Sequence, residues 1–148
     1  MSDADEKLFS LTEAERTRSR VEPTLLEAMQ SRRKMAELDK KLGALAERIM
    51  RQGGMVVPYE KAAKLRMERD GLATNIQGAL EQIESTGCVV KDLDVGLLDF
   101  PARLNDEDVY LCWRVGEDRI RFYHRQDEGF TGRKPIDPRD AGHQSPIQ

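Results

Sequence analysis

The sequence predicts an α+β protein in which a long antiparallel helical hairpin precedes a small four-stranded antiparallel sheet. Over most of the first half of the chain, apolar residues recur three and four positions apart, which is typical of helices that pack along one face. After Gly87 the pattern changes to an alternation that is typical of strands with one buried face. Charged residues make up 34% of the 148 residues and aromatic residues only 5%, as expected where much of the surface belongs to exposed helices.

The first helix is expected to begin at Ser10, because the run from Ser10 to Glu13 is a capping box in which each side chain bonds the other's backbone. Pro23 predicts a kink or short break in this helix at the residues just before it. The pair Gly53-Gly54 ends it. Beyond Pro23 the helix has one apolar seam that a partner helix could cover, formed by Met35, Leu38, Leu42, Leu45 and Ile49.

The second helix is expected from Tyr59 to about Thr86, where Gly87 stops it. Residues 24–51 and 59–86 each span roughly 42 Å as helix, and two equal helices joined by a short loop predict an antiparallel, coiled-coil-like hairpin. The second seam is formed by Ala62, Leu65, Leu72, Ile76, Ala79 and Ile83. Arg69 interrupts this seam, so it either reaches outward or marks a place where the helices separate.

Four strands are expected, at residues 88–93, 97–102, 109–115 and 119–124. In the third strand Trp113 shares a face with the other apolar residues, and in the fourth His124 shares a face with Ile120 and Phe122. Pairing Ile120 with either Val115 or Trp113 joins these two faces, whereas a slip of one residue would separate them. The pattern therefore predicts that Trp113 is buried and that His124 lies at the end of the same apolar face.

These elements suggest one domain with less ordered ends. Residues 1–9 are expected to form a flexible N-terminus and residues 131–148 a loosely ordered C-terminal tail. Between them, residues 10–130 form the predicted domain, with the hairpin at 10–87 and a β-meander at 88–130.

Composition argues against several classes of partner. The net charge of −3 gives no electrostatic support for binding to nucleic acid or a membrane surface. The basic run at residues 32–34 is interspersed with acidic neighbours, as on a solvated helix face. No apolar run approaches the roughly 20 residues of a membrane span, and the acidic start of the chain is unlike a secretory signal. Two cysteines, Cys88 and Cys112, are too few for a disulfide framework, so both are expected to be small apolar strand residues in a cytoplasmic protein.

Acidic residues are concentrated in the predicted sheet, where residues 88–128 hold ten Asp and Glu against six Lys and Arg. Most of them suit exposed turns. Asp92, Asp94 and Asp99 are harder to explain, because the first two flank one turn and the third lies within a strand, where aspartate is disfavoured. Asp99 is expected either to form a salt bridge with Arg103 or Arg121 or to be a functional carboxylate.

His124 is the second candidate, because one imidazole with a nearby carboxylate, here Asp127, can hold a divalent metal or act as a general base. The structural alternative is that His124 donates to a backbone carbonyl while Asp127 caps the following turn. The other histidine, His143, lies in the predicted tail, which excludes a multi-histidine zinc site. The sequence contains no Gly-rich phosphate loop, nucleophile elbow or paired Cys-x-x-Cys units, so no cofactor is predicted and a divalent metal is the one alternative.

Several segments resemble the prokaryotic family known as domain of unknown function 2203. They are residues 90–102 (VKDLDVGLLDFPA), 109–113 (VYLCW), 116–117, His124 with Asp127, and the glycine-rich stretch 129–136 (GFTGRKPI). The start at residues 9–14 (FSLTEA) is also similar. Tyr123 stands where the family pattern has a tryptophan. The resemblance implies a small cytosolic protein, and it implies no reaction, cofactor or partner.

Two functions are consistent with these features. The first is a non-enzymatic binding or assembly module, in which the hairpin forms a homodimer or binds another protein, since Leu25, Leu26 and Met29 lie off the seam. The second is a metal- or ligand-binding protein, an enzyme included, with an acidic site in the sheet region. The candidate residues of that site are Asp92, Asp99, Glu117, His124 and Asp127. If these side chains converge in space, the second function is favoured, and if they do not, it fails.

Overall fold

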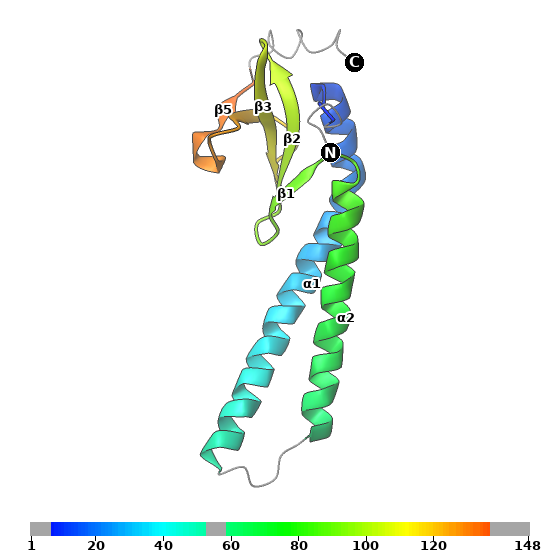
Figure 1. The fold of residues 1–148 in the computed structure, drawn as a ribbon, viewed down its shortest axis with the longest axis vertical. Coiled ribbons are helices and arrows are strands. Elements are labelled where there is room, and N and C mark those ends of the chain that lie inside the picture. Colours follow the sequence, from blue (N-terminus) through cyan, green and yellow to red (C-terminus); the bar gives the residue numbers. More distant parts are fainter. Residues whose placement is uncertain (1–6, 53–58, 137–148) are drawn as a thin grey trace.

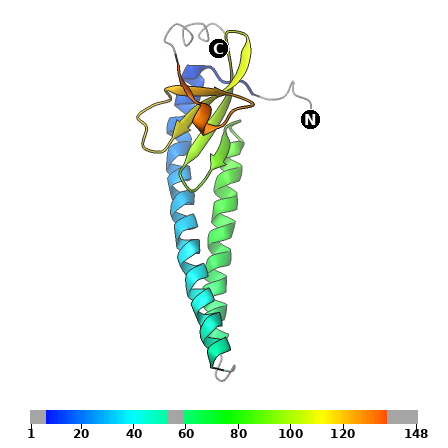
Figure 2. The ribbon, with the colours of Figure 1, turned by 90° about the vertical axis from the view of Figure 1, so that its left-hand side faces the viewer.

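The computed structural model describes residues 7–52 and 59–136. The two helices are α1 (Leu11–Arg51) and α2 (Tyr59–Glu84). They are followed by β1 (Val89–Asp92), β2 (Leu97–Leu104), β3 (Glu107–Arg114), β4 (Phe122–Arg125), the short 3-10 helix η2 (Phe130–Gly132) and β5 (Lys134–Pro135). The helices run side by side in opposite directions, and the sheet lies against the half that holds the start of α1 and the end of α2 (Figure 1). The other half of the hairpin extends beyond the sheet, as the rotated view also shows (Figure 2).

The start of α1 is the predicted capping box. Glu13 N–H donates to Ser10 Oγ at 3.1 Å, and Ser10 N–H donates to Glu13 Oε1 at 3.1 Å. The helix then continues for 41 residues through Pro23, so the short break suggested as one consequence of this proline is absent, while the kink stays a prediction. Val21 and Leu25, on either side of Pro23, are buried in the core, and this packing holds the helix together where the proline removes a hydrogen bond.

The hairpin is closed along the predicted seams. Five predicted seam residues are buried where the helices face each other, namely Leu38, Leu45, Ala62, Ile76 and Ile83, and Ala28, which is not one of the predicted seam residues, is buried there as well. Arg69 lies on the seam without opening it, because its Nε donates to Asp39 Oδ1 of α1. The long arginine side chain thus reaches the edge of the interface and forms an ion pair across it.

The sheet has five antiparallel strands in the order β1-β2-β3-β4-β5, so the prediction of four strands is wrong. The added strand, β5, pairs with β4 and comes from the first residues of the predicted tail. It is short and contains Pro135, which suits an edge strand. Residues 137–148 of that tail, and residues 1–6 of the predicted flexible N-terminus, lie outside the described residues. Phe9 is 2% exposed, and its N–H donates to Pro101 O at 2.7 Å.

One face of the sheet packs against the helices and forms the main core. Its largest member is Trp113, which is fully buried. The core also contains Leu25 and Met29 of α1 and Ile83 of α2. Leu25 and Met29 were expected to leave surface for a partner, but the sheet covers them. Only the neighbouring Leu26, with 43% of its surface exposed, remains open.

The register between β3 and β4 differs from the prediction by one residue. The paired residues are Val109 and Arg125, Tyr110 and His124, Leu111 and Tyr123, and Cys112 and Phe122. A slip of one residue moves every side chain of a strand to the other face. His124 therefore lies on the face opposite Trp113, and the prediction that both share the apolar face is wrong.

The cause of the slip is Ile120, which was expected inside the fourth strand. Its N–H donates to Glu15 Oε1 of α1 at 2.8 Å, and its side chain is buried in the core. Ile120 thus belongs to the connection between β3 and β4, and β4 begins two residues later, at Phe122. The connection is also tied back by Trp113 Nε1, which donates to Glu117 O at 3.1 Å.

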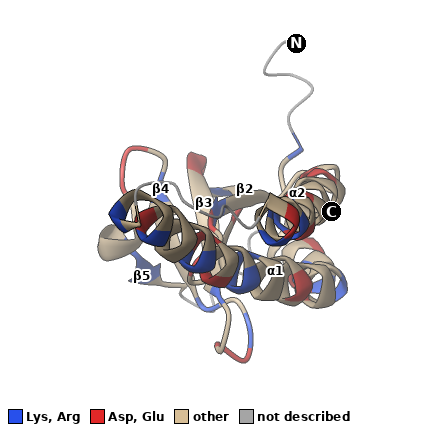
Figure 3. Cartoon of the chain, turned by 90° about the horizontal axis from the view of Figure 1, so that it is seen from below, with Lys and Arg blue, Asp and Glu red and all other residues tan. Residues whose placement is uncertain are grey.

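Charge on the helices is mixed. Viewed from below, blue and red segments both occur along α1 and α2 (Figure 3). Several of these charges pair locally, such as Arg18 with Glu15 and Glu22. Neither of the two described helices has a stretch that is both long and apolar enough for a membrane span.

Candidate metal centre

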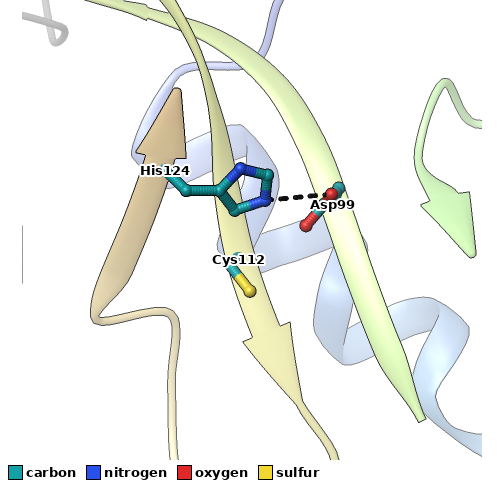
Figure 4. Close-up of side chains that lie close together, drawn as sticks. All are labelled: Asp99, Cys112 and His124. Carbon is teal, nitrogen blue, oxygen red and sulfur yellow. Dashed lines mark hydrogen bonds and ion pairs between the residues drawn. The ribbon is translucent and has the colours of Figure 1, made fainter. Parts of the chain in front are cut away.

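Three neighbouring strands bring an aspartate, a cysteine and a histidine together on the outer face of the sheet. Asp99 comes from β2, Cys112 from β3 and His124 from β4 (Figure 4). A carboxylate oxygen of Asp99, Sγ of Cys112 and a ring nitrogen of His124 all lie within 4.8 Å of one another. All three residues are buried, with at most 2% of their surface exposed. We call this group the Asp-Cys-His cluster.

The turn between β2 and β3 sets the pairing of the first two members. Asn105 and Asp106 form the two-residue connection and have φ values of 50° and 65°. Such positive values are tolerated best by Asn, Asp and Gly, and they match the twist of a tight hairpin. Counting back along both strands from this turn places Asp99 directly opposite Cys112.

The hydrogen bonds of His124 define which ring nitrogen faces the cluster. Nδ1 lies 2.8 Å from Arg125 O, which only accepts, so Nδ1 carries a hydrogen. This is the hydrogen bond to a backbone carbonyl that was expected for a His124 with a structural role. It leaves Nε2 facing Asp99, with Nε2 and Oδ2 3.1 Å apart. A backbone carbonyl that fixes the outer nitrogen and leaves the inner one directed at a site is the arrangement found around metal-binding histidines.

The two oxygens of Asp99 differ in their contacts. Oδ2 contacts His124, whereas Oδ1 is buried and accepts no hydrogen bond of ordinary geometry, although the Cys112 thiol interacts with the same carboxylate. In Figure 4 this second oxygen points to the side of the cluster where Cys112 lies. Burial raises the pKa of Asp99 above its ordinary value, and His124 partly opposes that rise. A buried carboxylate in this state is stabilised either by a proton or by a cation.

The prediction that Arg103 or Arg121 pairs with Asp99 is wrong. Arg103 bonds Asp108, and Arg121 forms two bonds to Asp118. Both arginines are on exposed positions, whereas Asp99 is turned into the buried layer.

The surroundings of Cys112 favour the protonated form of its thiol. Burial raises its pKa to about 12, and the negative charge of Asp99 acts in the same direction. A thiol in this state is a poor nucleophile, which argues against cysteine-based catalysis. A bound cation favours the thiolate form of a cysteine instead, because it replaces the proton on sulfur.

The other predicted site residues do not join the cluster. Asp92 is exposed, and its Oδ1 accepts from the N–H groups of Asp94 and Val95, so it shapes the β1–β2 turn. Asp127 is exposed as well. Glu117 is half-buried and bound to Arg133 Nη2 at 2.8 Å.

Arg133 and Glu117 form a second polar group next to the cluster. The guanidinium of Arg133 stacks on Phe122 and Phe130, with distances of 4.0 and 4.5 Å to the ring centres. Both charges act on the Cys112 thiol, Arg133 lowering its pKa and Glu117 raising it. This pair attaches the segment that holds η2 and β5 to the β3–β4 connection.

Cys112 is the site residue that sequence reasoning missed, because a lone cysteine in a strand resembles a small apolar residue. A signal was present in Asn105-Asp106. If these two residues form a two-residue turn, counting back along both strands pairs Asp99 with Cys112. The contact with an aspartate is not explained if Cys112 is only a small apolar residue. This turn does not place His124, because the side of the sheet on which His124 lies depends on the β3–β4 connection, which contains Ile120.

The fold and the cluster together define an α+β protein whose sheet buries an apolar core on one face and a polar group on the other. The chain belongs to the family described as "Uncharacterized conserved protein (DUF2203)", which matches residues 7–136. The resemblance of the motifs is thereby confirmed. No curated protein and no solved structure matches the chain.

Proposed function

We propose that this protein binds a divalent transition-metal ion, with Zn²⁺ preferred, through Asp99, Cys112 and His124. The observation that supports this most directly is the buried Oδ1 of Asp99, which accepts no hydrogen bond of ordinary geometry and lies beside the Cys112 thiol and the inner nitrogen of His124. Buried carboxylate oxygens without such a bond are rare in proteins, and a cation satisfies this one.

The distances support a four-coordinate ion. Ligand atoms bound at about 2.0–2.3 Å around a tetrahedral Zn²⁺ are about 3.3–3.8 Å apart. The three ligand atoms lie within 4.8 Å of one another, so binding requires shifts of about 1 Å. Three protein ligands leave a fourth position for a water molecule or an incoming group.

The donor types favour zinc over magnesium or calcium. Thiolate and imidazole are ligands of transition metals, whereas Mg²⁺ and Ca²⁺ take oxygen ligands. Both cysteines are free and buried, which suits a reducing compartment such as the cytoplasm. The competing explanation is that Asp99 and His124 share a proton and bind no metal.

Titration calorimetry of the chelator-treated protein with Zn²⁺, Ni²⁺ and Mn²⁺ tests this proposal. We expect one Zn²⁺ per chain, and His124→Gln or Cys112→Ser should weaken binding at least about 100-fold because each removes a direct ligand. Metal analysis of protein purified without added metal or chelator should show the same stoichiometry.

Two variants serve as matched controls. Cys88→Ser changes the other buried cysteine, which lies outside the cluster, and Asp127→Asn changes an exposed carboxylate. Both should bind Zn²⁺ as the wild type does. Equal heats for all proteins, or no heat above the buffer, would support the proton-sharing pair and end the metal proposal.

A second candidate function is assembly, with another copy of the chain as the partner of the hairpin. It is supported by apolar side chains on the half of the hairpin beyond the sheet. Met50 is 81% exposed, and Tyr59 and Met67 are each 75% exposed. Covering this surface in a symmetric dimer would remove it from water.

Light scattering at tens of micromolar tests the dimer. We expect the mass of two chains, and the double variant Met50→Glu/Met67→Glu should shift the protein towards a monomer because it places charge in the proposed contact. Gln30→Glu, at an exposed position of α1 closer to the sheet, is the control and should leave the mass unchanged. A wild-type mass of one chain would remove this candidate.

A further inference from the structure

A groove lies between the start of α1 and the strand β4, apart from the Asp-Cys-His cluster. Its volume is about 870 Å³, which is in the range of small-molecule sites. Residues from three separate parts of the chain line it, including Leu11, Arg16, Arg119, Ile120, Phe122 and Ile136. We call it the α1–β4 groove. The proposed metal centre makes no use of it.

Part of the groove is apolar and held in place by the fold. Ile120 is 4% exposed and belongs to the core, and Leu11 and Ile136 pack against that core. Ile136 is fixed by its N–H, which donates to Arg121 O at 2.8 Å. These residues offer a preformed apolar surface for a ligand.

Four charged side chains line the same groove, and two of them are already engaged. Glu15 accepts from the Ile120 N–H and from Arg18, and Arg18 also binds Glu22. Arg121 binds Asp118 with two hydrogen bonds of 2.8 and 2.9 Å. Arg16 and Arg119 are different. Among the described residues neither forms an ion pair or hydrogen bond through its side chain, and both are exposed at the groove.

We propose that the α1–β4 groove binds a small organic anion, with its apolar body against Ile120 and Ile136 and its anionic head between Arg16 and Arg119. Within the described part of the chain neither guanidinium forms an ion pair, although the charge of Asp118 acts on Arg119. Together the two groups complement one carboxylate or phosphate group, and each can bind it with several hydrogen bonds. The apolar lining selects anions that carry a hydrocarbon or aromatic body over inorganic ions.

The start of α1 is not the source of this binding. A helix N-terminus attracts anions through unsatisfied N–H groups. Here the Glu13 N–H is taken by Ser10, and the side chain of Glu13 occupies the same turn with a negative charge. The recognition therefore rests on the two arginines and the apolar lining.

Binding of 8-anilinonaphthalene-1-sulfonate, an aromatic anion whose fluorescence rises in apolar sites, tests this inference. We expect saturable binding of one dye per chain, and Arg16→Ala/Arg119→Ala should weaken it at least tenfold. Decanoate and decyl phosphate should displace the dye, and their relative strengths distinguish a carboxylate from a phosphate head. Decyl maltoside, which has the same tail and no charge, should not displace it below its micellar range.

The matched control is Arg33→Ala/Arg48→Ala, which removes the same charge from exposed positions of α1 away from the groove. It should bind the dye as the wild type does. Amide chemical shifts recorded with decanoate should change at residues 11–16 and 119–122. Equal affinity in both double variants, displacement by decyl maltoside, or shift changes confined to the hairpin end near Met50 and Met67 would overturn the inference. Circular dichroism identical to that of the wild type shows that each variant is folded.

Discussion

Replacing Trp113 by alanine is expected to lower the free energy of unfolding by about 3–5 kcal/mol. The indole is fully buried in the layer between sheet and helices, and no other side chain in the chain has its volume. Its Nε1 donates to Glu117 O, and the guanidinium of Arg18 lies 5.3 Å from the ring centre. The substitution therefore opens a cavity and leaves a carbonyl group without its donor. Urea unfolding followed by circular dichroism measures the loss.

Tyr59→Ala is the control for this prediction. It also removes an aromatic ring, but one that is 75% exposed, so the change in unfolding free energy should stay within about 0.5 kcal/mol. Because Trp113 is the one tryptophan of the chain, wild-type emission reports on it alone and should be blue-shifted. Emission near that of indole in water, or equal losses in the two variants, would contradict the burial of Trp113.

Saturating Zn²⁺ is expected to raise the free energy of unfolding by about 4 kcal/mol when its concentration is 1,000 times the Kd. The ligands Asp99, Cys112 and His124 come from three strands, so only the folded chain holds them together. Urea unfolding with Zn²⁺ and with a chelator, followed by the emission of Trp113, measures the difference.

The gain from Zn²⁺ depends on the intact cluster. His124→Gln should gain no more than about 1.4 kcal/mol from the same Zn²⁺ concentration, because a site weakened 100-fold is then exposed to only about 10 times its Kd. Mg²⁺ should not replace Zn²⁺, since thiolate and imidazole are poor ligands for it. A wild-type midpoint that is unaffected by Zn²⁺ would show that the Asp-Cys-His cluster is held by its own hydrogen bonds.

The helical half of the fold was predictable because its signals are local. The capping box from Ser10 to Glu13 forms as the sequence predicts, and Leu38, Leu45 and Ile76 are buried on the expected seams. Hydrogen bonds within one turn and residues three or four positions apart determine these features, whatever the rest of the chain does. Pro23 is the exception, since burial of its neighbours outweighs its tendency to interrupt the helix.

The sheet was predictable in kind but not in detail. The alternation after Gly87 indicates strands and predicts a buried Trp113, as the structure has it. It does not predict β5, because a two-residue edge strand containing Pro135 has no periodic pattern of its own. Leu25 and Met29 were likewise placed on open surface, since the sequence does not say which side of α1 the sheet covers.

For the candidate site, the sequence by itself determined that Asp99 is unusual for a strand and that His124 is the histidine to consider. Only the tertiary structure decided that these two meet, and that Cys112 joins them. The deciding contact is the one between Ile120 N–H and Glu15, residues 105 positions apart, which removes Ile120 from the strand and shifts the register by one. Because side chains alternate between faces, that one-residue shift moves His124 from the core to the outer face beside Asp99. A long-range bond of this kind leaves no local pattern, and so sequence alone could not place the site.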